Sequence, residues 1–247
     1  MAELAIIGGT GLPRLEGLEI ERREVMHTPY GEPSGAITYG TLCGTEVAFL
    51  PRHGYGHTIP PHMVNYRANL WCLQSKGISK VISICAVGGI RKDIVPGALI
   101  IPDQIIDYTW SRHHTFFEKD LASVTHIDFT EPYCQEMRDA LISAAREAGV
   151  SVIESGTYGA SQGPRLETAA EIDRMESDGC HMVGMTGMPE AALARELDLC
   201  YAACAVSANR AAGRGTEPIT MEMIERNIDA GLEQARVILK QLITSGS

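Results

Sequence analysis

The chain has 247 residues, of which 45% are hydrophobic and 21% are charged, and its formal net charge is −10. This composition excludes a disordered or fibrous chain, and the length is sufficient to bury a hydrophobic core. The acidic balance argues against nucleic acid or an anionic membrane as a partner, because clustered Lys and Arg bind both.

Apolar runs and amphipathic periods predict strands that alternate with helices along the whole chain. Short apolar runs bounded by glycine are typical of buried strands, and a glycine after a helical stripe marks a helix end. In chain order we expect strands at 4–7, 36–39 and 47–50, a helix at 62–76, strands at 81–87, 98–102 and 105–107, a helix at 136–148, strands at 152–153 and 157–160, a helix from about 167–168, a strand at 181–184, a helix at 189–198, a strand at 200–206 and a helix at 220–243.

This alternation predicts an α/β fold, with a central mixed β-sheet flanked by helices. No repeat, low-complexity linker or change of composition divides the chain, so we expect a single domain over residues 1–247. No apolar stretch approaches the ~20 residues of a membrane span, and the first residues lack the basic start of a signal peptide. We therefore expect a cytoplasmic protein with no membrane partner.

The seven cysteines are irregularly spaced and form no CxxC pair. This spacing supports neither a zinc site nor a thioredoxin-like pair, and we expect buried, reduced thiols. No set of His, Asp and Glu has the spacing of a metal site, and no serine hydrolase motif is present.

Polar residues follow several of the predicted strands, where ligands bind in α/β sheets. Thr10 lies in the glycine loop after the first strand, and Arg52 with His53 follows the strand at 47–50. An arginine fork suits a phosphate or carboxylate, although a surface salt bridge is an equally good interpretation of Arg52 alone. Asn209 follows a later strand, where a turn is the simpler interpretation.

Taken together, these segments resemble the trimeric family of purine nucleoside phosphorylases and methylthioadenosine phosphorylases, over essentially the whole chain. No single segment is specific, but their order along the chain is. The matching segments are Ile6 to Leu12, Arg52 to Gly54 with His57 to Ile59, Val64 to Tyr66 with Ala68 and Asn69, Glu131 with Pro132, Glu154 to Arg165, Met185 with Thr186, Pro189 with Glu190, and Cys200 to Ala202.

The resemblance implies phosphorolysis: inorganic phosphate attacks the anomeric carbon of a nucleoside, and the purine leaves. It implies no metal or organic cofactor, and phosphate is a co-substrate. It makes His53 and Asn209 catalytic and places Met185 against the ribose. The phosphate-binding residues that it implies are Thr10, Arg52, His53, Cys85, Ala86 and Thr186.

Two positions at the base indicate a 6-oxopurine. An Asn at position 209 can accept from purine N7–H and donate to a 6-oxo group, whereas methylthioadenosine enzymes carry Asp there and a second Asp where Ala211 stands. Glu167 matches a Glu that accepts the N1–H of a 6-oxopurine, although it could instead be only a helix N-terminal charge. Arg210 matches the basic residue that follows Asn in the inosine and guanosine enzymes.

The residues expected near the 5′ position of the sugar indicate a methylthio group instead of a hydroxyl. Met221 stands where inosine enzymes have a His that binds the 5′-hydroxyl, and with Ile224 it suits an apolar substituent, although helix core is an alternative role. His126 matches a residue that a neighbouring subunit contributes to this pocket. The resemblance therefore implies a homotrimer with active sites at subunit interfaces.

These residues combine a 6-oxopurine base with a 5′-methylthio sugar, and we predict phosphorolysis of 5′-methylthioinosine to hypoxanthine and 5-methylthioribose 1-phosphate. The alternatives within the family are methylthioadenosine and inosine or guanosine as substrates. From other classes, a non-catalytic nucleoside-binding protein remains open, whereas a dinucleotide-binding oxidoreductase lacks the third glycine of its motif.

Overall fold

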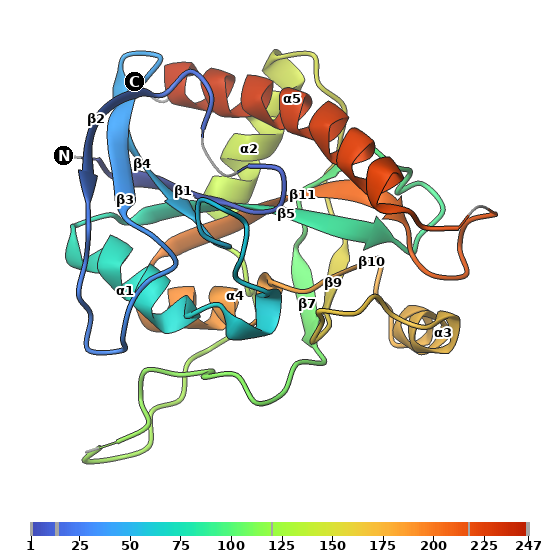
Figure 1. The fold of residues 1–247 in the computed structure, drawn as a ribbon, viewed down its shortest axis with the longest axis horizontal. Helices are drawn as coiled ribbons and strands as arrows, with labels where there is room; N and C mark the ends of the chain where they lie inside the picture. The colour runs from blue at the N-terminus through green and yellow to red at the C-terminus, as the bar shows by residue number, and fades with distance from the viewer. Residues whose placement is uncertain (1, 13–14, 120, 217, 246–247) are drawn as a thin grey trace.

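A computed structural model describes residues 2–12, 15–119, 121–216 and 218–245 (Figure 1). Within these residues, eleven strands form one sheet in which parallel and antiparallel pairs occur together. The expected α/β fold with a mixed central sheet is confirmed. The strands are β1 (Leu4–Gly8), β2 (Glu19–Glu24), β3 (Ile37–Leu42), β4 (Thr45–Pro51), β5 (Lys80–Gly89), β6 (Leu99–Ile100), β7 (Gln104–Asp107), β8 (Val152–Ile153), β9 (Thr157–Ala160), β10 (Met182–Gly184) and β11 (Cys200–Arg210).

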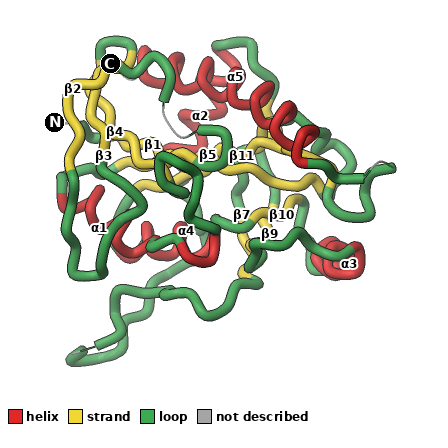
Figure 2. Tube along the Cα trace, viewed as in Figure 1, coloured by secondary structure: helices red, strands yellow, loops and turns green. Residues whose placement is uncertain are grey.

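Helices cover both faces of the sheet, as Figures 1 and 2 show. The helices α2 and α5 lie on one face, and α1 and α4 lie on the other, while α3 lies beside β9 and β10. Their bounds are α1 (Tyr66–Ser75), α2 (Gln135–Glu147), α3 (Ala169–Ser177), α4 (Gly187–Glu196) and α5 (Met221–Ser245), with a 3₁₀ turn η1 (Pro61–Met63) before α1.

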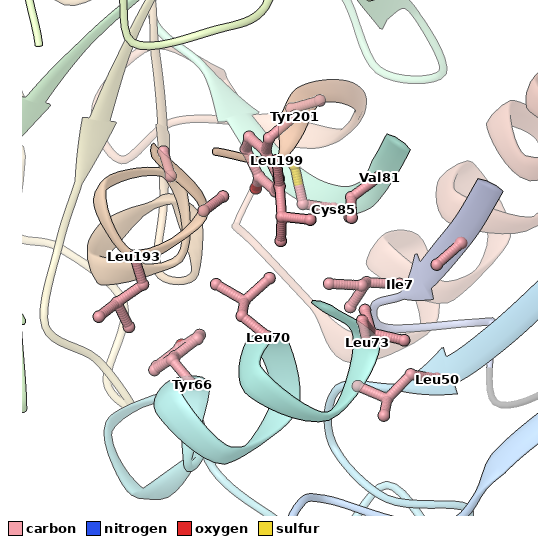
Figure 3. Packing of buried hydrophobic residues seen from close by; sticks show 14 of the residues in the cluster. Ile7, Leu50, Tyr66, Leu70, Leu73, Val81, Cys85, Leu193, Leu199 and Tyr201 are labelled. Atoms are coloured by element: carbon pink, nitrogen blue, oxygen red, sulfur yellow. The ribbon is translucent and has the colours of Figure 1, made fainter. Parts of the chain in front are cut away.

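Two hydrophobic cores result, because successive side chains of a strand point to opposite faces. In β1, Ile7 packs into the core under α1 and α4, whereas Ile6 belongs to the core under α2 and α5. Figure 3 shows the first core, where Leu70 and Leu73 of α1 lie close to Ile7. Both cores rest on β5 and β11, which are buried along almost their whole length.

The pairing of β5 changes along one of its edges. One edge pairs with parallel β11 throughout. The other edge pairs with parallel β1 at residues 80–83 and with antiparallel β10 at residues 88 and 89. Between them, residues 84–87 have no strand partner on this edge among the described strands. The sheet therefore opens at the carboxyl-terminal half of β5.

Three elements differ from their prediction. Helix α1 begins at Tyr66 rather than near residue 62, because the side chain of Asn65 caps it by accepting from Ala68 N. Strand β2 has no apolar alternation, so periodicity could not reveal it. It is mostly exposed, and among the described strands its one partner is β3. Strand β11 continues to Arg210, so Asn209 lies within a strand and not after one.

The expectation of seven buried thiols was wrong for three cysteines. Cys134 and Cys200 form a disulfide with a Cα–Cα distance of 5.1 Å, and Cys43 is exposed in the turn between β3 and β4. The backbone N–H of Cys134, which precedes α2, donates to the carbonyl of Tyr201, and this contact brings the two cysteines together. The remaining four cysteines are buried and free.

The segment between β7 and α2 extends away from the body of the molecule (Figure 1). It holds several exposed apolar side chains, including those of Trp110 and Val124. As to a membrane, none of the helices in the described parts of the chain has the length and apolar character to span one.

Candidate active site

A cavity of about 530 Å³ lies where the sheet opens beside β5. Its wall combines the glycine loop after β1, the loop after β4, the open edge of β5, the loop before α3, the segment after β10, the end of β11 and the start of α5. Most of the residues predicted for the site line it: Thr10, Arg52, His53, Cys85, Ala86, Glu167, Met185, Thr186, Asn209, Ala211, Met221 and Ile224.

Two predicted residues lie outside this lining. The guanidinium of Arg210 is turned to the loop after β5, where it donates to the carbonyls of Arg91 and Lys92. His126 is exposed in the extended segment between β7 and α2.

Arg52 is fully buried, with 0% of its side chain exposed to solvent. Its Nε donates to Glu190 at 2.6 Å, and its Nη2 donates to Glu190 and to Ser83 at 2.8 and 2.6 Å. Its Nη1 donates to the Ile84 carbonyl at 3.0 Å, and its second hydrogen is not used by these partners. Burial opposes the charge, but the Glu190 carboxylate outweighs it and raises the pKa of Arg52.

Glu190 of α4 holds this arginine by two hydrogen bonds, at 2.6 and 2.8 Å. Its side chain is 1% exposed and also accepts hydrogen bonds from Ser83 Oγ and Tyr201 Oη, both at 2.8 Å. Burial and then the Glu190 charge raise the pKa of Tyr201 well above its usual value, so this hydroxyl remains a donor. Every described partner of the carboxylate is thus a donor, and Arg52 is held in one orientation.

His53 is neutral and presents an acceptor. Its Nδ1–H donates to the Ile59 carbonyl at 2.8 Å, which leaves Nε2 without a hydrogen. Burial, and next the neighbouring Arg52 charge, lower the pKa of His53 to about 4. Near neutral pH its free nitrogen Nε2 can therefore only accept a hydrogen bond.

The small residue Gly9 allows the first loop to approach the open edge of β5. A Cβ at this position would lie 2.5 Å from the Ile84 carbonyl oxygen and 2.9 Å from Arg52 Nη1. Any larger residue would therefore displace either the strand or the arginine. Burial raises the pKa of the neighbouring Cys85 to about 12, so this residue lines the cavity as a neutral thiol.

Two side chains that suit a purine face the same cavity from different elements. Asn209 of β11 is buried, and its amide donates to the Arg210 carbonyl at 2.6 Å, which leaves its oxygen and one hydrogen. Glu167 comes from the loop between β9 and α3, and its Oε1 accepts from Ser161 Oγ at 2.5 Å. One group therefore both accepts and donates, and the other accepts.

An apolar wall completes the cavity. Met221, Ile224 and Ile228 come from the first two turns of α5, and Ile219 precedes this helix. Met221 is 64% exposed, whereas Ile224 and Ile228 are buried. Their spacing of three and four residues puts these side chains on one helix face, so Met221 belongs to the cavity wall more than to the core.

Residues that sequence reasoning did not place in the site are His57, Glu190 and Arg112. His57 lines the cavity, and its Nε2 lies 3.2 Å from Thr10 Oγ1. His57 and Glu190 stand in the matching sequence segments, but no local pattern indicates their contacts. Arg112 lies in the extended segment, where nothing in the sequence singles it out.

Arg112 joins two loops of the site. Its Nη1 donates to the carbonyls of Met185 and Met188, at 2.8 and 2.5 Å. Its Nη2 donates to the carbonyls of Ser161 and Gln162, at 3.3 and 2.7 Å. The guanidinium therefore fastens the loop that carries Met185 to the loop that leads to Glu167. As for metals, the described residues contain no group of three or more His, Cys, Asp or Glu arranged to hold one.

The fold and the site together define the class of protein to which this chain belongs. A family model described as the phosphorylase superfamily matches residues 3–244, and the chain belongs to this family. The predicted resemblance and the prediction of a phosphorylase enzyme are confirmed.

Two curated relatives are similar to this chain over most of its length. The chain is 50% identical over 245 residues to a probable S-methyl-5′-thioinosine phosphorylase of Pseudomonas syringae pv. tomato, which covers 99% of this chain and 100% of the relative. It is 48% identical to a 6-oxopurine nucleoside phosphorylase of Pyrococcus furiosus, over 91% of this chain and 86% of the relative.

A solved structure is also similar. The methylthioadenosine phosphorylase from Schistosoma mansoni in complex with adenine superposes with a TM-score of 0.94 at 31% identity, over 99% of this chain and 91% of that one. Methylthioinosine, 6-oxopurine nucleoside and methylthioadenosine phosphorylases thus all occur among the relatives of this chain.

Proposed function

We propose that the chain catalyses the phosphorolysis of 5′-methylthioinosine to hypoxanthine and 5-methylthioribose 1-phosphate. The observation that carries this proposal is a combination in one cavity. Glu167 and Asn209 can pair with a 6-oxopurine, and Met221 with Ile224 provides an apolar contact for the methylthio group. The names of the curated relatives support the same substrate.

In this proposal, phosphate binds beside the open edge of β5. The second hydrogen of Arg52 Nη1, the hydroxyls of Thr10 and Thr186 and the backbone amide of Ala86 are the donors, and Cys85 lines the same wall. The neutral His53 accepts the hydrogen of a monohydrogen phosphate through Nε2. A chain with a net charge of −10 would thus bind an anion through local donors inside a pocket.

The base lies between Glu167 and Asn209. Glu167 accepts the N1–H of hypoxanthine, while the Asn209 oxygen accepts N7–H and its remaining amide hydrogen donates to O6. Adenine has no N1–H to give and would leave Glu167 unpaired, which disfavours methylthioadenosine. Ala211 leaves room beside the base, and Met185 packs against the ribose. Arg210 acts outside the pocket, where it holds the loop after β5.

The reaction needs position and electrostatic stabilisation more than proton transfer. A phosphate oxygen forms the new bond to C1′ as the bond from C1′ to N9 breaks, and the electron pair of that bond leaves with the purine. Positive charge on the ribosyl group is stabilised by the adjacent phosphate. Monohydrogen phosphate gives up one proton as the sugar phosphate forms, and N7 of the leaving purine takes up one proton, with solvent carrying the exchange. This proton reduces the negative charge on the purine, and the resulting N7–H is held by Asn209.

A substrate panel tests the proposal. The protein is incubated with methylthioinosine, methylthioadenosine or inosine, with and without phosphate, and free base is measured. We expect phosphate-dependent release of hypoxanthine from methylthioinosine, with a higher kcat/KM than for the other two. Release without phosphate would indicate a hydrolase, and no release at all would favour a nucleoside-binding protein. A preference for methylthioadenosine or for inosine would establish the corresponding alternative.

We also propose that the protein works as a homotrimer. The extended segment between β7 and α2 has exposed apolar side chains, and its His126 is exposed and does not line the cavity of its own chain. Packed on a neighbouring chain, this segment would bring His126 to the apolar wall of that chain. Light scattering that gives three times the 26.7 kDa of one chain would support the trimer, and a monomeric mass would exclude it.

A further inference from the structure

The side chain of Ser161 holds the carboxylate that faces the base. Ser161 follows β9, is 7% exposed, and donates from Oγ to Glu167 Oε1 at 2.5 Å. Its backbone is fixed on two sides: its N–H donates to the Gly184 carbonyl at 2.8 Å, and its carbonyl accepts from Arg112. The hydroxyl therefore starts from a rigid position and points at one oxygen of Glu167.

Neighbouring charged groups do not perform this task. Arg165, two residues before Glu167, is paired through both Nη atoms with Glu171. Glu171 in turn accepts from the backbone of Thr168 in the capping box of α3. Among the described residues, Ser161 is the one side chain that hydrogen-bonds to Glu167. The orientation of this carboxylate thus depends on one hydroxyl.

We propose that Ser161 determines the preference for a 6-oxopurine by holding Glu167 as an oriented acceptor. The inference rests on the proposed function and deepens it. With Oε1 occupied by the Ser161 hydroxyl, Oε2 is the atom left for the base.

This arrangement discriminates between the two kinds of base. Hypoxanthine presents N1–H, which an ionised and oriented carboxylate accepts. Adenine presents an N1 lone pair, so only a protonated carboxyl group could pair with it. Without the hydroxyl, Glu167 loses its orientation for N1–H. This loss reduces the preference for methylthioinosine over methylthioadenosine.

A matched pair of variants tests this inference, namely Ser161→Val and Ser161→Thr. Valine and threonine have nearly the same shape, and only threonine keeps a hydroxyl. For each, kcat/KM is measured with methylthioinosine and with methylthioadenosine. We expect Ser161→Val to lower the preference for methylthioinosine by about tenfold or more, since one oriented polar pair is lost, while Ser161→Thr stays within about threefold of the wild type.

A double-mutant cycle separates specificity from structure. In a Glu167→Ser background, Ser161→Val should leave the substrate preference unchanged, because the carboxylate on which it acts is absent. A merely structural serine would instead lower kcat/KM for both substrates equally in either background. Thermal unfolding of each variant identifies losses that come from misfolding, and Ser161→Ala replaces Ser161→Val if the larger side chain is not tolerated.

Failure of the inference about Ser161 can be distinguished from failure of the proposed function. If the wild-type protein cleaves methylthioinosine with phosphate but Ser161→Val, or Ser161→Ala in its place, keeps the full preference, the inference is wrong and the proposed function stands. If the wild-type protein releases no hypoxanthine from methylthioinosine, the proposed function is wrong, and the inference fails with it.

Discussion

Arg52 and Glu190 form a buried ion pair between residues that are 138 positions apart in the chain. Arg52 follows β4 at one side of the sheet opening, and Glu190 lies in α4. The two-point contact with Glu190 and the hydrogen bonds to Ser83 and the Ile84 carbonyl use four of the five guanidinium hydrogens, so these partners determine where the fifth one points. A residue outside the cavity lining thereby positions one that is inside it.

Glu190→Gln should destabilise the protein and impair catalysis. The amide keeps the shape but leaves the buried Arg52 charge without a counter-charge, and breaking a buried pair costs about 3–5 kcal/mol. We expect a loss of this size in denaturant unfolding, and at least a tenfold lower kcat/KM for phosphate, because Arg52 loses its orientation. The control is Glu154→Gln, which removes an exposed partner of Arg146 and should change neither quantity appreciably. Wild-type stability in Glu190→Gln would contradict this account.

His53 should make stability depend on pH in mild acid. Its pKa is about 4 in the folded protein and about 6.5 when unfolded, so between these values the unfolded chain binds the extra proton. The contribution of His53 to the free energy of unfolding is therefore complete above pH ~6.5. It is lost as the pH falls toward 4, by about 3 kcal/mol in total. Below that pH, His53 adds no further change.

The measurement is the free energy of unfolding from pH 4 to 7 for the wild type and for His53→Asn. Asparagine can still donate to the Ile59 carbonyl but does not titrate. The difference between the two proteins should grow as the pH rises from 4 to 6.5 and then stay constant. Parallel curves would show that His53 does not titrate in this way.

Asn209→Asp combined with Glu167→Ser should shift the substrate preference toward methylthioadenosine. The aspartate accepts from a 6-amino group, and the serine removes a carboxylate that adenine leaves unpaired. We expect the ratio of kcat/KM for methylthioadenosine to that for methylthioinosine to rise about tenfold or more. No gain in methylthioadenosine cleavage would count against the proposed roles of both residues.

Met221→His should raise the use of inosine relative to methylthioinosine. The imidazole can bind a 5′-hydroxyl, and it removes apolar surface from the wall that Ile224 continues. We expect a severalfold change in the kcat/KM ratio, measured with both substrates at saturating phosphate. Met223→His is the matched control, since this residue of the same helix does not line the cavity. An equal change in both variants would place the effect in the helix and not in the pocket.

Much of the site could be predicted because its residues stand next to strand ends. Thr10, Arg52, Cys85 and Met185 each lie in or beside a strand that is apolar enough to be recognised, and the family resemblance joined them into one site. Arg210 shows the limit of this reasoning: it lies within β11 and not after a strand, and its side chain follows hydrogen-bond acceptors on a different loop.

The amino-acid sequence alone determined the α/β alternation, the phosphorylase family and most of the cavity lining, because these depend on local periodicity and on motifs of a few residues. Only the tertiary structure decided the contacts of Glu190 with Arg52, of Ser161 with Glu167, of Arg112 with two loops, and of Cys134 with Cys200. It also decided which nitrogen of His53 is free. The physical reason is that buried polar groups must find partners, and the partners within reach depend on how the strands pair and how the helices pack over them.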